Sequence, residues 1–68
     1  MTYEMMKEIV SYGANLTLSK GVTFDQLKDL VSLAKGSGAK ITIGFALSHD
    51  SMREIASMGG NQVTFIHY

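Results

Sequence analysis

The segment VTFDQLKDLVSL, at residues 22–33, decides the fold, because its chemistry recurs twice elsewhere in the chain. The segments MTYEMMKEIVSY at 1–12 and LSHDSMREIASM at 47–58 keep the same order of apolar, hydroxyl, ring, acidic and basic positions. Repetition at a period of about 21 to 25 residues is typical of stacked supersecondary units, which bury their apolar faces against one another. The recurrence therefore predicts a repeat architecture built from one local unit.

A short alternating block follows each copy of this segment. The blocks are LTL at 16–18, ITI at 41–43 and VTF at 63–65. A chain of 68 residues is long enough for one domain with a modest core. We therefore predict a single domain over 1–68, with units at about 1–19, 22–44 and 47–66.

Each long segment carries the signals of an amphipathic helix. Thr23 precedes Gln26 by three residues, which is the spacing of a capping box. Ser48 occupies the same position in the third unit, although Ser51 with Glu54 offers a competing helix start. Apolar residues then recur every three or four positions, as on one face of a helix. Glycines, which suit the left-handed position that closes helices, follow each segment: Gly13, Gly36, Gly38, Gly59 and Gly60.

The alternation in the short blocks predicts strands with one apolar and one polar face. Thr17, Thr42 and Thr64 form the polar face, and the apolar residues beside them form the other. Repetition of helix and strand requires parallel pairing with right-handed crossovers. The predicted fold is an α/β two-layer open sandwich, with three parallel strands in the order 1-2-3 and three helices on one face. A 2-1-3 order, with helices on both faces, is the alternative that the threonines disfavour.

Six basic and six acidic residues give the chain no formal net charge. The basic surplus of non-specific nucleic-acid binders is missing, so no nucleic-acid partner is expected. The chain also lacks cysteine and any apolar run of the roughly 18 residues that a membrane span needs. These features exclude thiol chemistry and predict a cytoplasmic protein without a membrane partner. Near-zero net charge also favours self-association.

In parallel sheets, ligands bind beyond the carboxyl ends of the strands. Lys20, Gly21 and Thr23 follow the first strand and lead into a helix N-terminus, which is a place that can hold an anion. His49 and Asp50 follow the second strand and reach the same edge. These five residues form the candidate site of a small-ligand or anion-binding domain. A minor enzyme that uses His49, Asp50 and Lys20 in acid-base chemistry is a further alternative.

The repeat predicts plainer roles for two of these residues. His49 occupies the position of Tyr3 and Phe24, which predicts a packing ring. Asp50 occupies a position that is acidic in all three units, where a negative charge compensates the helix dipole. Two histidines without thiolates make a poor metal site, so neither a metal nor another cofactor is expected, and no catalytic residue is assigned.

An open three-stranded sheet leaves two strand edges unpaired, and free edges invite pairing with another chain. The chain has no proline, and the segment QVTFIHY at 62–68 has no charged residue when histidine is neutral. We therefore predict a non-enzymatic assembly or protein-binding module. Its expected partner is a second copy in a homodimer through a sheet edge or face, or another protein that adds a strand. The candidate interface residues are Gln62, Thr64, Ile66 and Tyr68.

Overall fold

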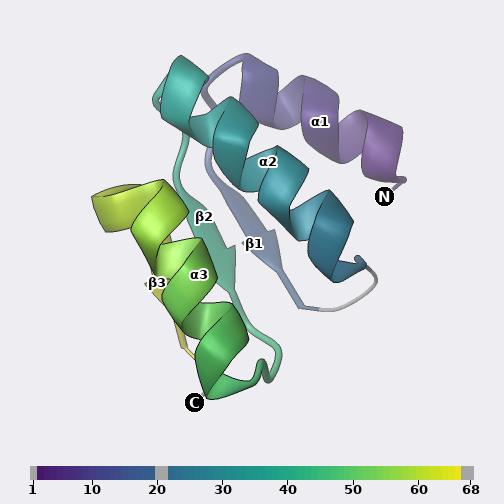
Figure 1. Ribbon diagram of the computed structural model, residues 1–68. Helices are drawn as coiled ribbons and strands as arrows, with labels where there is room; N and C mark the ends of the chain where they lie inside the picture. The colour runs from purple at the N-terminus through teal and green to yellow at the C-terminus, as the bar shows by residue number, and fades with distance from the viewer. Residues whose placement is uncertain (1, 20–21, 67–68) are drawn as a thin grey trace.

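The computed structural model describes residues 2–19 and 22–66 of the chain. Helix and strand alternate three times along the described residues, and a short 3₁₀ helix, η1, precedes the last strand (Figure 1). The elements are α1 (Tyr3–Ser11), β1 (Leu16–Leu18), α2 (Phe24–Ser37), β2 (Ile41–Ile43), α3 (His49–Gly59), η1 (Gly60–Gln62) and β3 (Val63–Phe65).

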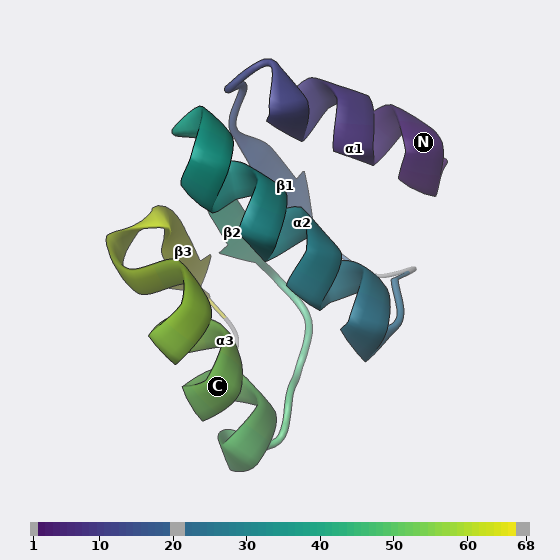
Figure 2. The same cartoon turned by 45° about the horizontal axis from the view of Figure 1, so that its top comes forward.

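The three strands form one parallel sheet in the order β1-β2-β3. Leu16 lies opposite Ile41, and Ile41 lies opposite Val63, so all three units have the same register. The helices lie side by side on one face of this sheet (Figures 1 and 2). The prediction of a two-layer open α/β sandwich with order 1-2-3 is confirmed, and the 2-1-3 alternative is wrong.

Hydroxyl side chains begin all three helices. Thr2, Thr23 and Ser48 are the N-caps, and the side-chain oxygen of each accepts a hydrogen bond from the backbone N–H three residues further on. The capping box at the start of α2 is complete, because the Thr23 backbone N–H also donates to Gln26 Oε1 at 3.0 Å. In the third unit the helix begins after Ser48, and the competing start at Ser51 lies inside α3. Local sequence signals therefore set where each helix begins.

The hydrophobic core lies between the helices and the sheet. Leu18, Ile41 and Ile43 contribute the apolar face of the strands, whereas Thr17 and Thr64 on the other face are exposed. This arrangement confirms the predicted strand faces. The buried apolar residues are Val10, Leu16, Leu18, Leu27, Leu30, Val31, Ala34, Ala39, Ile41, Ile43 and Ile55.

Polar side chains join each unit to the helix before it. The Ser37 hydroxyl donates to the Val10 carbonyl near the end of α1, at 2.6 Å. The Gln62 amide donates to the Ala34 carbonyl near the end of α2, at 2.6 Å, and to the Ala39 carbonyl at 2.7 Å. The Val10 carbonyl also accepts from the Gly13 N–H, and the Ala34 carbonyl also accepts from the Gly38 N–H. The side-chain donors therefore add second hydrogen bonds at these helix ends and tie neighbouring units together.

Candidate functional site

The carboxyl edge of the sheet is the first candidate site. Lys20 and Gly21 lie outside the described residues. Both the hydroxyl and the N–H of Thr23 are engaged in the capping box of α2. Asp50 is exposed in the first turn of α3, which confirms its predicted place at the positive end of the helix dipole. In the described part of this edge, Thr23 therefore caps α2 and Asp50 lies in the first turn of α3.

His49 is exposed, so the prediction that it packs like Tyr3 and Phe24 is wrong. Tyr3 and Phe24 are half-buried because each lies beside the following helix. The Tyr3 hydroxyl, for example, donates to Asp29 on α2 at 3.2 Å. The described residues contain no helix on the far side of α3, so nothing covers His49 in the same way.

The contact between neighbouring helices repeats from unit to unit. The Lys7 ammonium lies 5.0 Å from the centre of the Tyr3 ring, and the Lys28 ammonium lies 5.2 Å from that of the Phe24 ring. Lys28 also pairs with Glu54 on α3, with 3.4 Å between the nitrogen and the oxygen. The ring and the base of one helix therefore face the next helix, and an acid of that helix faces back toward them.

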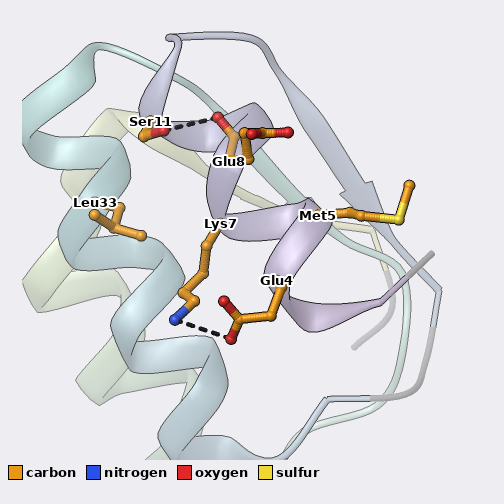
Figure 3. Close-up of a pocket in the computed structure, with 6 residues that line it drawn as sticks. All are labelled: Glu4, Met5, Lys7, Glu8, Ser11 and Leu33. Atoms are coloured by element: carbon orange, nitrogen blue, oxygen red, sulfur yellow. Dashed lines mark hydrogen bonds and ion pairs between the residues drawn. The ribbon is translucent and has the colours of Figure 1, made fainter.

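A shallow groove of about 530 Å³ lies beside α1, and Figure 3 shows the side chains that line it. Lys7 pairs with Glu4 at 3.3 Å, and the Ser11 hydroxyl donates to the Glu8 carbonyl at 2.7 Å. Met5 points away from α2 in this view. Leu33 of α2 completes the lining. Lys7, Glu4 and the Ser11 hydroxyl are thus engaged within α1, whereas the Glu8 carboxylate has no ion-pair partner among the described residues.

Among the described residues, Tyr3 is the titratable group whose pKa is clearly shifted by its environment. Partial desolvation raises the pKa of its phenol above the ordinary value. The hydrogen bond to Asp29 and the negative charges of Asp29 and Glu4 raise this pKa further. Because the hydroxyl joins α1 to α2, the shift reflects packing between helices.

Residues 2–19 and 22–66 contain no group of three histidine, cysteine, aspartate or glutamate side chains close enough to hold a metal ion. Within the same ranges, every helix is too short or too polar to cross a bilayer.

Comparison with known proteins found no matching family model, no similar curated protein and no similar solved structure.

The edge strand β3 is the second candidate site. Ile66, which follows β3, is 62% exposed, and its side chain lies near Gly44, which follows β2; an added Cβ at Gly44 would be 3.5 Å from Ile66 Cδ1. Thr64 is also exposed. Gln62, in contrast, is half-buried, and its amide donates within the chain. Tyr68 lies outside the described residues, so the candidate surface on β3 consists of Thr64 and Ile66.

Exposed residues on the outermost helices were missed by reasoning from the sequence. Met5 and Tyr12 on the α1 side are 52% and 80% exposed. Glu8 of α1 and Arg53 of α3 are exposed, and neither has an ion-pair partner among the described residues. For Glu8 and Arg53, comparison of the three units carried the signal, because their counterparts in the middle unit, Asp29 and Lys28, bind a neighbouring helix.

Proposed function

We propose that this chain is a small non-enzymatic assembly module that self-associates through the free edge of β3. The observation that carries the proposal is that the apolar side chains of β3 are less buried than those of β2. Ile41 and Ile43 of β2 are fully buried, whereas Val63 and Phe65, at the same register positions of β3, are only half-buried. An element placed beside β3 would cover this remaining apolar surface, which favours association.

The backbone of β3 supports the same proposal. The Ile66 N–H donates to the Ile43 carbonyl at 3.1 Å, so the backbone N–H of Ile66 points toward β2. Backbone groups of alternate residues in a strand point to opposite sides, so the N–H and C=O of Phe65 point toward the free edge. An added strand pairs with such groups, and the segment Val63–Ile66 contains neither the charge nor the proline that normally blocks an edge.

The charge of the chain is consistent with this function. Its formal net charge is zero, so copies do not repel one another as strongly charged proteins do. Sedimentation velocity between about 10 µM and about 1 mM tests the proposal, because association in this range corresponds to a Kd near or below the millimolar level. We expect the mean mass to rise with concentration, and a monomer throughout would contradict the proposal.

A chemically synthesised chain with an N-methyl group on Phe65 tests the edge itself. This group removes the outward N–H and obstructs an added strand, while the hydrogen bonds between β2 and β3 remain. We expect the methylated chain to keep the circular dichroism of the unmethylated synthetic chain and to sediment as a monomer. Unchanged assembly of a folded methylated chain would show that the β3 edge is not used.

A further inference from the structure

We propose that the partner at this edge is the α1–β1 end of a second copy, so that copies join head to tail and continue the repeat. The inference rests on the proposed function and specifies its geometry. In this arrangement α1 of the second copy packs beside α3, and its β1 pairs with β3 in parallel. The second copy thus takes the place of a fourth unit.

The helix contacts inside the chain define what such a unit must present. At the α1–α2 contact, Tyr3 of α1 binds Asp29 of α2. At the α2–α3 contact, Lys28 of α2 binds Glu54 of α3, which occupies the same repeat position as Asp29. A helix packed beside α3 by the same rule must therefore offer an acid at this position.

Glu8 of α1 is the acid at that repeat position. It has no ion-pair partner among the described residues, and Figure 3 shows it on the side of α1 away from α2. On α3, His49 and Arg53 occupy the positions of Tyr3 and Lys7 and are exposed. The two ends of the molecule thus carry complementary groups, a carboxylate on α1 and basic side chains on α3.

Exposed apolar residues lie beside Glu8 on the same side of the first helical segment. Met5 and Tyr12 lie three residues before and four residues after Glu8, so the three occupy one stripe of the helical segment. Leu33 and Met58, the counterparts of Tyr12 in the other units, are half-buried against the core. Met5 and Tyr12 remain 52% and 80% exposed. If α1 packed beside α3, the side chains of Met5 and Tyr12 would become less exposed to solvent.

The strand edges also match. The Leu16 N–H donates to the Lys40 carbonyl, and the Leu18 carbonyl accepts from the Gly44 N–H, so both residues face β2. The N–H and C=O of Thr17 therefore point toward the free edge of β1. The internal register, in which Leu16 opposes Ile41 and Ile41 opposes Val63, would continue with Leu16 of the second copy opposite Val63.

Charge favours this arrangement over a two-fold dimer of β3 with itself. A two-fold axis beside β3 would bring the outer sides of two α3 helices toward each other, with the positive charge of Arg53 on both. Such a dimer would place like charges together and leave Glu8 and its stripe uncovered. Head-to-tail contact pairs opposite charges, and it produces open chains or closed rings instead of isolated two-fold dimers.

Charge reversal on each side of the contact tests the inference. We expect the variants Glu8→Arg and Arg53→Glu, each alone, to weaken association about tenfold or more, because like charges then meet. An equimolar mixture of the two variants should recover association, since each contact then joins opposite charges again. The double variant should recover it for the same reason. Lys35→Glu, an equal change in charge on α2, is the control and should assemble like the parent.

Backbone pairing supplies a second and independent test. Thr17→Pro removes the outward N–H of β1 without removing a hydrogen bond to β2, so the fold should survive while assembly is lost. Thr17→Val keeps this N–H and should assemble like the parent. Circular dichroism of each variant verifies folding before sedimentation.

The outcomes separate the two proposals. A monomeric parent overturns both of them. If the parent assembles and N-methylation of Phe65 prevents it, but Glu8→Arg and a folded Thr17→Pro leave it unchanged, the β3 edge is used by a different surface and the head-to-tail inference is wrong. Loss of assembly in each single variant, with recovery in the mixture, supports the inference.

Discussion

The Lys28 ammonium lies 3.4 Å from the Glu54 carboxylate and joins α2 to α3. Both side chains are more than one-third exposed, so solvent screens the pair. We expect Lys28→Met to lower the free energy of unfolding by about 0.2 to 1 kcal/mol, because exposed ion pairs contribute in this range. Urea unfolding at low and high salt measures the effect.

A double-mutant cycle separates the ion pair from the packing of the Lys28 stem over Phe24. Glu54→Gln and the variant with both substitutions complete the cycle. We expect a coupling free energy that falls as salt rises. A coupling free energy of zero at low salt would mean that Lys28 acts through its packing over Phe24 alone.

Gln62 should be among the most sensitive polar positions. Its amide donates to two carbonyls, those of Ala34 and Ala39, in a partly buried setting. Gln62→Leu leaves the Ala39 carbonyl without this donor, whereas the Ala34 carbonyl keeps its hydrogen bond from the Gly38 N–H. We expect a loss of about 1 to 3 kcal/mol in the free energy of unfolding, mainly from the Ala39 carbonyl. Asn61→Leu is the matched control, because Asn61 is exposed, and it should change stability by less than about 0.5 kcal/mol. Equal effects at the two positions would argue against the internal role of Gln62.

Substitution by alanine should change the free energy of unfolding in opposite directions at two helical glycines. A Cβ added at the buried Gly59 would collide with Val63 Cγ2 and lie 3.1 Å from Val31 Cγ1. We expect Gly59→Ala to lose about 1 to 3 kcal/mol, which is typical of overpacking. A Cβ at Gly36 meets no described atom within 4 Å, so Gly36→Ala should gain about 0.5 to 1 kcal/mol from helix propensity. Thermal unfolding of both variants checks the pair, and a stabilising Gly59→Ala would contradict the packing described here.

Ionisation of Tyr3 should lower the stability of the folded chain at alkaline pH. Its pKa is raised in the folded chain, so the folded state holds the phenolic proton more tightly than the unfolded state does. The contribution is complete below the unfolded pKa of about 10 and is lost as pH rises through the folded pKa. We expect the difference in stability between the parent and Tyr3→Phe to shift against the parent above about pH 10. Tyr12→Phe, at a residue that is 80% exposed, is the control for the loss of a tyrosine hydroxyl.

The fold could be predicted largely from local patterns. Thr23 with Gln26 predicted the start of α2, and the threonines of the strands predicted the uncovered face of the sheet. The predicted end of α2 was less sharp, because the helix passes through Gly36 and ends at Gly38, whose φ is +86°. Glycine tolerates both conformations, so sequence alone does not say which of two glycines closes a helix.

The candidate sites were less predictable because they depend on contacts between distant segments. The roles of Thr23 and Asp50 follow from their neighbours in the chain, and the structure confirms them. The internal role of Gln62 requires residues 28 and 23 positions away, which no local pattern indicates. The sequence predicted that His49 packs in the interior, because the same repeat position holds the rings of Tyr3 and Phe24 in the other units. A ring at this position is covered only when another helix follows.

The sequence by itself determined the repeating unit, the starts of the helices, the two faces of the strands and the order of the sheet. These properties follow from caps and periodicities that operate within a few residues. Only the tertiary structure decided which side of each helix meets its neighbour. Figure 2 shows α1 and α3 as the outer helices of the row. Glu8 of α1 and Arg53 of α3 are exposed, because equivalent positions in a repeat differ in burial once the row of helices ends.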